Sequence, residues 1–237
     1  VLPDDACRSA TILPVRSPRN GQTLAVVGLL GAEPGAPIAR PAVRDSVLSL
    51  VTVAVERSID ERRLAHQATH DPLTGVGNRA ALLDRLTLVL ARAKRSGGAV
   101  AVLFCDLDGF KAVNDHYGHD RGDRLLVEVA ERIGRAVRPS DTVCRTGGDE
   151  FVIVCEDLAD ADQAHTIAER VRTTIEAEPV DVGETRLPVT VSVGVAVADL
   201  PADDPDRLLR TADLAMYARK QRRAAVRRHP VSQEEVA

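Results

Sequence analysis

The sequence predicts an α+β fold, an α/β sandwich in which helices cover a central sheet. From about Thr69 onward, stretches of helical periodicity alternate with short apolar runs. One of these runs, residues 99–105, is apolar throughout, as expected for a strand buried on both faces. The three phenylalanines and two tyrosines all lie after residue 100. This compositional shift indicates one complete domain with an N-terminal appendage.

The N-terminal residues 1–55 are interpreted as part of a sensory domain. A turn-rich segment joins the expected strands at 11–15 and 24–30. A helix is expected over 41–68, with an apolar face in its first half and strong charge in its second. Two strands and a helix bury too little surface to fold alone, so residues 1–55 are expected to be only the end of such a domain. We interpret residues 56–68 as a connector helix. A docked extension without a regulatory role is the alternative.

The elements of the larger domain follow from periodicity and turn signals. Gly97-Gly98 suits the end of a helix, and Gly147-Gly148 suits the two-residue turn of a β-hairpin. The apolar stripe of Leu125, Val129 and Ile133 indicates a long helix. Besides the strand at 99–105, we expect helices at 79–96, 110–117 and 120–137, strands at 142–145 and 150–155, a helix at 161–177, a strand at 187–198 and a helix at 205–223.

The composition narrows the class of protein. A net charge of −4 gives no support for a nucleic-acid binder. The four cysteines form no CxxC pair, which favours a reducing compartment. The longest strongly apolar stretch, 47–55, is too short to span a membrane, and no signal peptide opens the chain, so we expect a cytoplasmic location. The basic residues between 219 and 228 either form a solvated helix end or contact phosphate.

Carboxylates lie at the ends of two expected strands. Asp106-Leu107-Asp108 directly follows the strand at 99–105, and Asp149-Glu150 directly follows the glycine pair of the hairpin. Mg²⁺ prefers one or two carboxylates, with water and phosphate oxygens completing its shell. Asp106 with Asp149 or Glu150 would therefore hold a metal–nucleotide complex. Because strand side chains alternate faces, the two members of each acidic pair need not reach one ion. Neither motif alone is a strong indication of a metal site, and the two together are a much stronger one.

The segment after the first carboxylates carries polar residues suited to a guanine nucleotide. Asn114 offers an amide, and Asp123 offers a carboxylate that can accept hydrogen bonds from N1–H and the exocyclic amine. Alternatively, Asp123 lies in the first turn of a helix and complements the helix dipole. Lys111 either contacts phosphate or is a solvated helix lysine. His116 and His119 flank a glycine turn and are interpreted as structural.

Together these segments resemble the GGDEF family of diguanylate cyclases, over roughly residues 66–223. The matching segments are 71–79 (DPLTGVGNR), 106–115 (DLDGFKAVND) with Gly118-His119 and Gly122-Asp123, 147–151 (GGDEF), 191–196 (VSVGVA), and 212–217 (ADLAMY) ending at Lys220. The family implies a palm-like, mostly antiparallel sheet. We expect the cyclase domain at 69–225 and a flexible tail at 226–237. Residues 1–55 resemble a GAF domain much more weakly, and we assign them no ligand pocket.

The resemblance implies an enzyme that condenses two GTP molecules into cyclic di-GMP and releases two pyrophosphates. It implies a two-fold homodimer, whose assembly the helix at 41–68 is placed to set, and Mg²⁺ as cofactor with Mn²⁺ as the alternative. By position, the metal ligands are Asp106, Leu107 through its carbonyl, Asp149 and Glu150; the catalytic residues are Asp149, Glu150 and Lys111; and the substrate-binding residues are Asn114 and Asp123 for guanine, and Lys111 and Lys220 for phosphate.

The chain departs from the family at one phosphate-binding position. Where the family has Gly-Arg, this chain has Arg223-Ala224. Either Arg223 or Arg222 substitutes for the displaced arginine, or the affinity for triphosphate is lower.

An inhibitory product site is implied by Arg138-Pro-Ser-Asp141, an RxxD motif that grips cyclic di-GMP in this family, with Arg170 as a secondary contact. An arginine guanidinium suits both phosphate oxygens and guanine faces. The alternative is a helix-terminal arginine followed by a turn.

Two other functions stay open. A catalytically weak domain would serve as a receptor for cyclic di-GMP at Arg138 and Asp141, or for GTP. A cyclase that makes a different nucleotide is disfavoured, because Asn114 and Asp123 match the guanine-reading positions.

Overall fold

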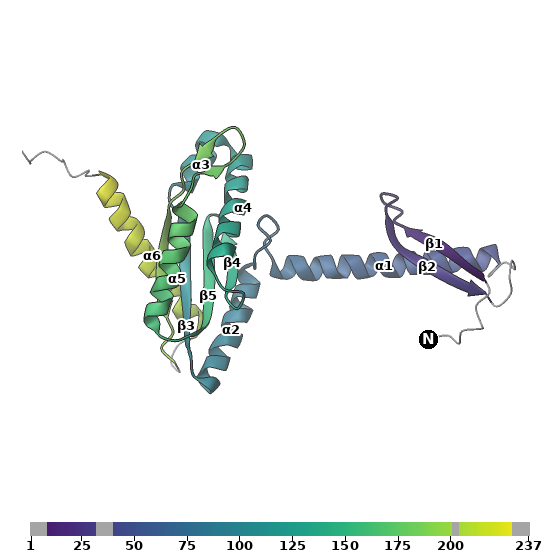
Figure 1. The fold of residues 1–237 in the computed structure, drawn as a ribbon, viewed down its shortest axis with the longest axis horizontal. Coiled ribbons are helices and arrows are strands. Elements are labelled where there is room, and N and C mark those ends of the chain that lie inside the picture. Colours follow the sequence, from purple (N-terminus) through teal and green to yellow (C-terminus); the bar gives the residue numbers. More distant parts are fainter. Residues whose placement is uncertain (1–8, 32–39, 201–203, 229–237) are drawn as a thin grey trace, which may run out of the picture. The chain divides into compact units, whose positions relative to one another are not determined.

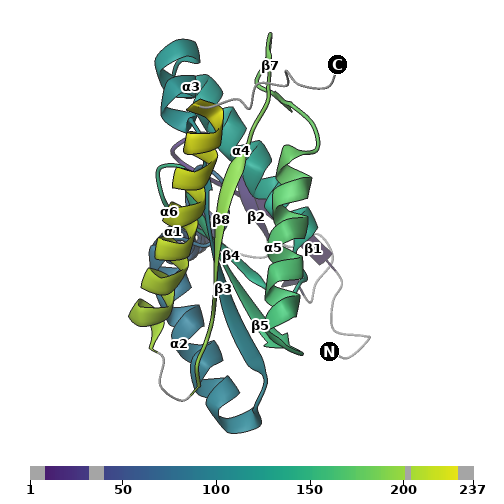
Figure 2. The ribbon, with the colours of Figure 1, turned by 90° about the vertical axis from the view of Figure 1, so that its left-hand side faces the viewer.

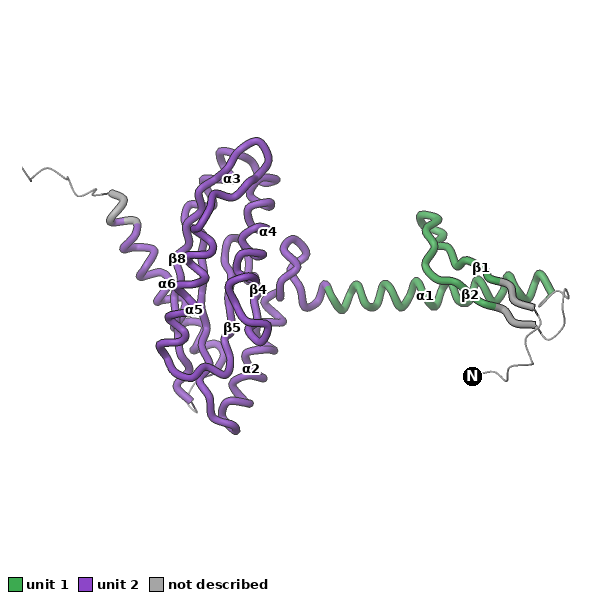
Figure 3. Tube along the Cα trace, viewed as in Figure 1, with its two compact units in different colours: residues 1–66 green, residues 67–237 purple. Residues whose placement is uncertain are grey.

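The computed structural model describes residues 9–31, 40–200 and 204–228. Residues 1–8 and 32–39 of the expected sensory segment and 229–237 of the expected tail lie outside the described residues. Contacts divide the chain into two compact units, 1–66 and 67–237 (Figure 3). Within the described ranges, no helix combines the length and the apolar character that crossing a membrane requires.

The N-terminal unit contains a β-hairpin and most of a long helix. β1 (Ser9–Arg16) pairs antiparallel with β2 (Thr23–Gly31), and α1 (Pro41–Thr69) follows (Figure 1). No residue of α1 is buried. The apolar side chains that give this helix its periodic pattern are therefore largely exposed.

Polar contacts tie the turn of this hairpin to α1. The hydroxyl of Ser17 donates a hydrogen bond to Glu56 at 2.9 Å, and Arg19 forms an ion pair with Asp60 at 3.1 Å. The Arg19–Asp60 pair is exposed on both sides, so it contributes little free energy.

The larger unit is built on a four-stranded antiparallel sheet. Its strands are β3 (Ala99–Leu107), β4 (Thr142–Gly147), β5 (Glu150–Leu158) and β8 (Val191–Val197), in the order β4-β5-β3-β8. Its helices are α2 (Arg79–Ser96), α3 (Phe110–Tyr117), α4 (His119–Ala136), α5 (Ala161–Glu176) and α6 (Pro205–Arg228). Every pair of neighbouring strands in this sheet is antiparallel. The predicted α+β fold with a mostly antiparallel sheet is confirmed.

Helices cover both faces of this sheet (Figure 2). Val102 and Phe104 of β3 lie in the apolar cluster formed with α2 and α6. Leu103 and Cys105, which alternate with them, lie in the cluster formed with α4 and α5. β3 is thus buried on both faces, as its apolar sequence predicts. Three free thiols are buried in the sheet, those of Cys105, Cys144 and Cys155.

Two boundaries at the centre of the sheet differ from those predicted. β3 continues through Leu107, so Asp106 lies within the strand rather than after it, because it pairs with residues on both neighbouring strands. The hairpin turn consists of Gly148-Asp149 rather than the glycine pair, because Gly147 is already paired with Glu150.

Two differences occur nearer the C-terminus. The strand expected at 187–198 is shorter, because residue 187 belongs to a separate small hairpin of β6 (Val180–Asp181) and β7 (Arg186–Leu187), which was not predicted. The last helix continues past residue 223 to Arg228, so residues 226–228 of the expected flexible tail are helical.

Candidate functional site

An arginine holds the tip of the β4–β5 hairpin. Gly148 adopts a φ of 51°, a conformation that glycine reaches without the steric cost of a side chain. The guanidinium of Arg145 donates to the carbonyl of Gly148 at 3.0 and 2.7 Å. It also donates to the carboxylate of Asp71 at 3.0 and 3.1 Å. Since Asp71 precedes α2, this ion pair fixes the hairpin tip against the segment that leads into α2.

The Asp71 carboxylate is stabilised in its charged form. Burial acts to raise the pKa of Asp71, but hydrogen bonds from Thr74 and the interaction with Arg145 outweigh it. The pKa of Asp71 therefore lies below its ordinary value of 3.8. The ion pair with Arg145 is intact at neutral pH as a result.

The predicted metal ligands gather where β3 meets the start of β5. Asp106 lies directly opposite Glu150 in the antiparallel register, and such pairs project from the same face of a sheet. The backbone N–H of Leu107 donates to the carbonyl of Asp149 at 3.4 Å, which places the hairpin turn beside the end of β3. The structure thus brings together the four residues that the sequence assigns to the metal.

Asp106 is buried, Asp149 and Glu150 are partly buried, and the three carboxylates repel one another. Asp106 is only 7% exposed, and this burial raises its pKa. The negative charges of Asp149 and Asp108 raise it further. Burial also raises the pKa of Glu150, with further contributions from Asp106, Asp149 and Asp213, although a hydrogen bond from Thr146 opposes it. The carboxylates therefore concentrate negative charge at this end of the sheet.

The donor set fits a divalent cation that arrives with a nucleotide. In the described part of the chain, no group of three or more His, Cys, Asp or Glu side chains is arranged to hold a metal by itself. Mg²⁺ commonly takes one or two protein carboxylates, and phosphate oxygens and water supply the rest of its shell. Asp106 and Glu150 on one face, with the backbone of Leu107 beside them, offer the hard oxygen donors that this ion prefers.

Lys220 of α6 lies against the predicted metal ligands. Its ammonium group forms an ion pair with Asp106 at 2.5 Å. Burial acts to lower the pKa of Lys220, but the hydrogen bond to Asp106 and the surrounding carboxylates raise it above its ordinary value. Lys220 is therefore a fixed positive charge at the site.

Arg223 links α6 to the residue that follows β3, to β8 and to α5. Its guanidinium donates to Asp108 at 3.0 Å, to the carbonyl of Val191 at 2.7 Å and to Glu176 at 2.9 Å. Asp108 also accepts hydrogen bonds from the hydroxyls of Thr190 and Ser192. The arginine that was predicted to bind phosphate is thus engaged by two carboxylates. Arg222, the other candidate, is exposed.

Asn114, predicted to bind guanine, carries an unsatisfied acceptor. Its Oδ1 atom is buried and has no hydrogen-bond partner within the described residues. Gly122 of α4 makes room for it, since a Cβ atom at that position would lie 1.9 Å from Oδ1. The side chain of Asn114 is therefore held in place with an acceptor that a ligand can satisfy.

Asp123 follows Gly122 and is exposed. It lines a cavity of about 420 Å³ together with Leu73 and Val127. Arg124, Glu128 and Asp181 also line this cavity, so its lining is mostly charged. Lys111, in the first turn of α3, is also exposed and forms no ion pair among the described residues.

The predicted product-site residues lie around the C-terminal end of α4, at the opposite end of β4 from the hairpin tip. The carboxylate of Asp141 accepts a hydrogen bond from the backbone N–H of Arg138 at 2.9 Å, and its Oδ1 atom is buried without a partner in the described chain. Arg170 of α5 donates to the carbonyl of Ala136 at 2.6 Å. The side chain of Arg138 is exposed.

Sequence reasoning missed several residues of the site. Gly122 and Asp213 both fall inside motifs that were recognised, but no role was assigned to them. The ion pair of Asp71 with Arg145 joins residues 74 positions apart in the chain, so only the fold reveals it. Thr146, which donates to Glu150 at 3.2 Å, gave no signal of its own.

Comparison with known proteins identifies relatives of the larger unit. MucR of Pseudomonas aeruginosa, a bifunctional diguanylate cyclase/cyclic di-GMP phosphodiesterase, is 44% identical over 182 residues, which cover 75% of this chain and 26% of MucR. The response regulator PleD of Caulobacter vibrioides is 42% identical over 155 residues, which cover 65% of this chain and 34% of PleD. The chain therefore spans well under half the length of these relatives.

Solved structures give the same result. The GGDEF domain of TpbB from Pseudomonas aeruginosa superposes with a TM-score of 0.62 at 38% identity, covering 65% of this chain and 89% of that domain. The coiled coil and GGDEF domain of DgcB from Caulobacter crescentus, solved in complex with c-di-GMP, superposes with a TM-score of 0.65 at 31% identity, covering 75% of this chain and 94% of that one.

The family model described as "Diguanylate cyclase, GGDEF domain" matches residues 68–225. The match begins after the N-terminal hairpin, so the GAF-like character of that segment stays a prediction. The matched residues include the β3 and β5 carboxylates, Asn114 and the RxxD motif. The chain therefore belongs to the GGDEF diguanylate cyclase family.

Proposed function

We propose that the larger unit condenses two GTP molecules into cyclic di-GMP and releases two pyrophosphates, with Mg²⁺, or Mn²⁺ in its place, as the cofactor. The observation that carries this proposal is the pairing of Asp106 with Glu150 across β3 and β5, with Lys220 ion-paired to the same site. Membership of the family and the c-di-GMP bound to DgcB support it. Because GTP is a cytoplasmic metabolite, we also propose a cytoplasmic site of action.

Asp106, Asp149, Glu150 and the carbonyl of Leu107 would hold the metal. When bound, the ion neutralises charge on the phosphates and on the attacking and leaving oxygens. Lys220 adds a positive charge at the same place, and Lys111 is free to contact a phosphate. The reaction is an in-line displacement at the α-phosphorus, so the contribution of these side chains is positioning and charge neutralisation. Asp149, in the two-residue turn between β4 and β5, is the candidate acceptor of the proton from the 3′-hydroxyl.

Guanine selection is assigned to Asn114 and Asp123. The buried Oδ1 of Asn114 can accept a hydrogen bond from the exocyclic amine, which satisfies an acceptor whose isolation costs free energy. Asp123 can accept from N1–H and the same amine. Adenine has an unprotonated N1 in that position, which would face a carboxylate without a hydrogen between them. This repulsion disfavours ATP.

We also propose that cyclic di-GMP inhibits the enzyme at Arg138, Asp141 and Arg170. The buried, unpartnered Oδ1 of Asp141 is an acceptor for a guanine N–H, and the exposed guanidinium of Arg138 suits a phosphate or a guanine face. Arg170 already contacts the end of α4 and would make the secondary contact.

A two-fold homodimer is proposed as the active state, because each subunit binds one GTP and the product is symmetric. α1 carries exposed apolar side chains along its length, which a second copy of the helix would cover. They are Val43, Val47, Leu50, Val53, Ile59 and Leu64.

A product assay tests the function. Incubation with GTP and Mg²⁺, followed by chromatography, is expected to yield cyclic di-GMP and pyrophosphate, and Asp149→Ala is expected to abolish both. One observation favours a second function, that of a receptor. Arg223 is held by Asp108 and Glu176, and the family's phosphate-binding arginine is replaced by Ala224. Tight binding of cyclic di-GMP or GTP by the wild-type protein without synthesis would establish the receptor function instead.

A further inference from the structure

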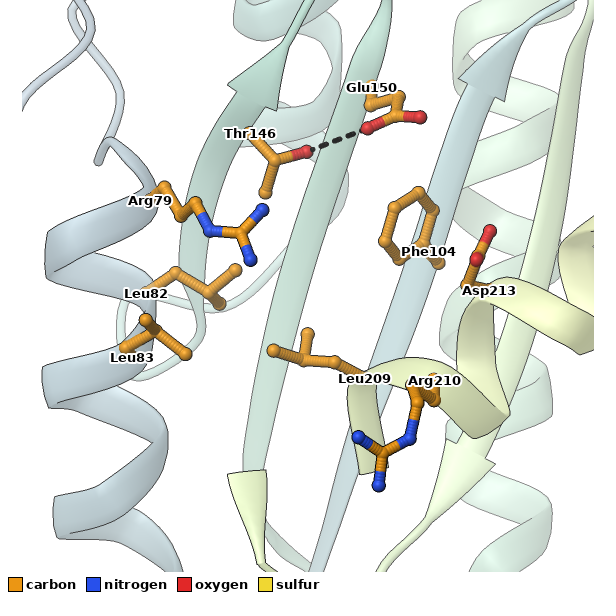
Figure 4. A pocket seen from close by; sticks show the side chains of 9 residues that line it. All are labelled: Arg79, Leu82, Leu83, Phe104, Thr146, Glu150, Leu209, Arg210 and Asp213. Carbon is orange, nitrogen blue, oxygen red and sulfur yellow. Dashed lines mark hydrogen bonds between the residues drawn. The ribbon is translucent and has the colours of Figure 1, made fainter. Parts of the chain in front are cut away.

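A cavity of about 240 Å³ lies between α2 and α6, over the face of the sheet that carries Glu150 (Figure 4). Its floor is the ring of Phe104 on β3, and its walls include Leu82, Leu83 and Leu209 from the two helices. Glu150 lies at one end of the cavity in Figure 4. The cavity therefore borders the site predicted to bind the metal and nucleotide.

Two guanidinium groups and two carboxylates line this cavity. Arg79 comes from the start of α2, Arg210 and Asp213 from α6, and Glu150 from β5. Arg79, Arg210 and Asp213 take part in no ion pair within the part of the chain that the structure describes. Because the charges balance, the cavity suits a neutral group with several hydroxyls better than it suits a triphosphate.

The position of the cavity along α6 separates it from the phosphate-binding lysine. Asp213 precedes Lys220 by about two helical turns and Arg210 by nearly three, and Lys220 is ion-paired with Asp106. Asp106 in turn lies opposite Glu150. The carboxylate pair thus lies between the cavity on one side and Lys220 on the other.

The geometry of phosphoryl transfer indicates which reactant would occupy the cavity. The attacking oxygen and the leaving oxygen lie on opposite sides of the phosphorus. If Lys220 neutralises the phosphates that leave, the attacking hydroxyl approaches from the side of the cavity.

We propose that this cavity is the subsite for the ribose of the second GTP, which a partner subunit presents with its 3′-hydroxyl toward the α-phosphorus. This inference rests on the proposed cyclase function and deepens it. A cavity of about 240 Å³ is smaller than pockets that enclose a whole ligand of drug size, roughly 300–1,000 Å³, so it accepts part of a nucleotide.

In this step, the 3′-oxygen forms a bond to the α-phosphorus, and the bond from that phosphorus to the β-bridging oxygen breaks. The electron pair of the broken bond leaves with pyrophosphate, and the hydroxyl proton passes to a carboxylate of the site. Asp213 accepts a hydrogen bond from the 2′-hydroxyl, and Arg79 donates to the ribose oxygens. Leu83 and Leu209 exclude water from the approach.

Filling the cavity tests the subsite. Leu83 is only partly buried, so Leu83→Trp can extend into the cavity without replacing a core side chain. Cyclic di-GMP synthesis is expected to fall about 100-fold, as misplaced reactants commonly do. The dissociation constant for the α,β-methylene analogue of GTP, which cannot release pyrophosphate, should be unchanged because guanine is bound elsewhere. Leu88→Trp is the matched control, since Leu88 lies on the same helix and is 58% exposed.

A second variant tests the subsite in case Leu83→Trp does not fold. Asp213→Asn changes no volume, and we expect it to lower kcat about tenfold through the loss of a charged hydrogen-bond acceptor, with analogue binding again unchanged. Full synthesis by both variants would overturn the subsite while leaving the cyclase function standing. A parallel loss of analogue binding would also overturn it, because the cavity would then serve the subunit's own nucleotide. Absence of synthesis by the wild-type protein would instead refute the proposed function.

Discussion

At the scale of single residues, the site depends on side chains whose positions are set by their neighbours. Asn114 is placed by the absence of a side chain at Gly122, and Lys220 is placed by its ion pair with Asp106. Asp108 and Glu176 hold Arg223 in the same way. The side chains that we propose to contact substrate are therefore held by other residues of the chain.

Gly122→Ala is expected to weaken GTP binding about tenfold, because the new Cβ would lie 1.9 Å from Oδ1 of Asn114 and displace the amide. Titration calorimetry with the α,β-methylene analogue of GTP measures this change. Gly134→Ala is the matched control, since it lies on the same helix and a Cβ there meets nothing within 4 Å. If both variants bind alike, Gly122 does not position Asn114.

A second prediction at this scale concerns Asp71 and acid. Because its pKa is lowered in the folded protein, Asp71 contributes stability above its unfolded value of 3.8 and loses that contribution as the pH falls through the folded pKa. Asp71→Asn should therefore cost about 1–2 kcal/mol of unfolding free energy at pH 6. The difference from wild type should shrink toward zero below the folded pKa. Urea denaturation at pH 6 and pH 3 compares them, and a pH-independent difference would contradict the assignment.

At the scale of elements, α6 carries Lys220 and Asp213 and must lie close against β8 to present them. Gly194 of β8 permits this approach, because a Cβ atom there would lie 2.1 Å from the carbonyl of Ala212 and 2.2 Å from the backbone nitrogen of Met216. Backbone atoms cannot move aside as a flexible side chain can. The distance between α6 and the sheet is thus fixed by one glycine.

Gly194→Ala is expected to destabilise the larger unit by about 3 kcal/mol through overpacking. Thermal unfolding followed by circular dichroism measures the loss. Gly28→Ala serves as a comparison, since Gly28 is also a strand glycine but a Cβ there meets nothing within 4 Å. A melting temperature equal to that of wild type would show that α6 tolerates displacement.

At the scale of the whole molecule, the chain joins a unit with few buried residues to a GGDEF domain with a complete core. Six large apolar side chains of α1 are exposed, and one of them, Leu64, is 65% exposed. A helix of this kind is stabilised when another helix covers its apolar side chains. This surface supports the proposal that α1 of one subunit pairs with α1 of another.

Leu64→Glu is expected to shift the protein toward the monomer and to lower cyclic di-GMP synthesis at least tenfold at micromolar concentration, because a buried charge would oppose helix pairing. Analytical ultracentrifugation and the product assay measure the two effects. Leu88→Glu, another exposed leucine at 58%, is the control. Unchanged turnover by a monomeric Leu64→Glu protein would refute the proposed coupling.

Much of the fold could be predicted because each element carries a local signal. The helix at 79–96 and the helix at 110–117 have the expected bounds. The extension of β3 through Asp106 could not be predicted, because aspartate disfavours strands and only its pairing with β5 and β8 keeps it there. The small β6–β7 hairpin was missed because it has only two residues in each strand.

The site shows the same division. The motifs pointed to Asp106 and Glu150 as carboxylates of one site, but only the pairing of β3 with β5 places the two opposite each other. The partners of Arg223 could not be predicted, since Asp108 lies 115 residues away and Glu176 lies 47 residues away in the chain. The cavity beside Glu150 was also missed, because it forms only when α2 and α6 pack on one face of the sheet.

The buried thiols of the sheet have a practical consequence. Burial raises the pKa of Cys105 to about 12 and that of Cys144 to about 11, and it raises the pKa of Cys155 as well. A thiol in this state forms almost no nucleophilic thiolate at neutral pH. A thiol-labelling reagent would therefore modify these cysteines only when the strands open. Reaction of these three thiols thus reports the opening of the sheet that contains them.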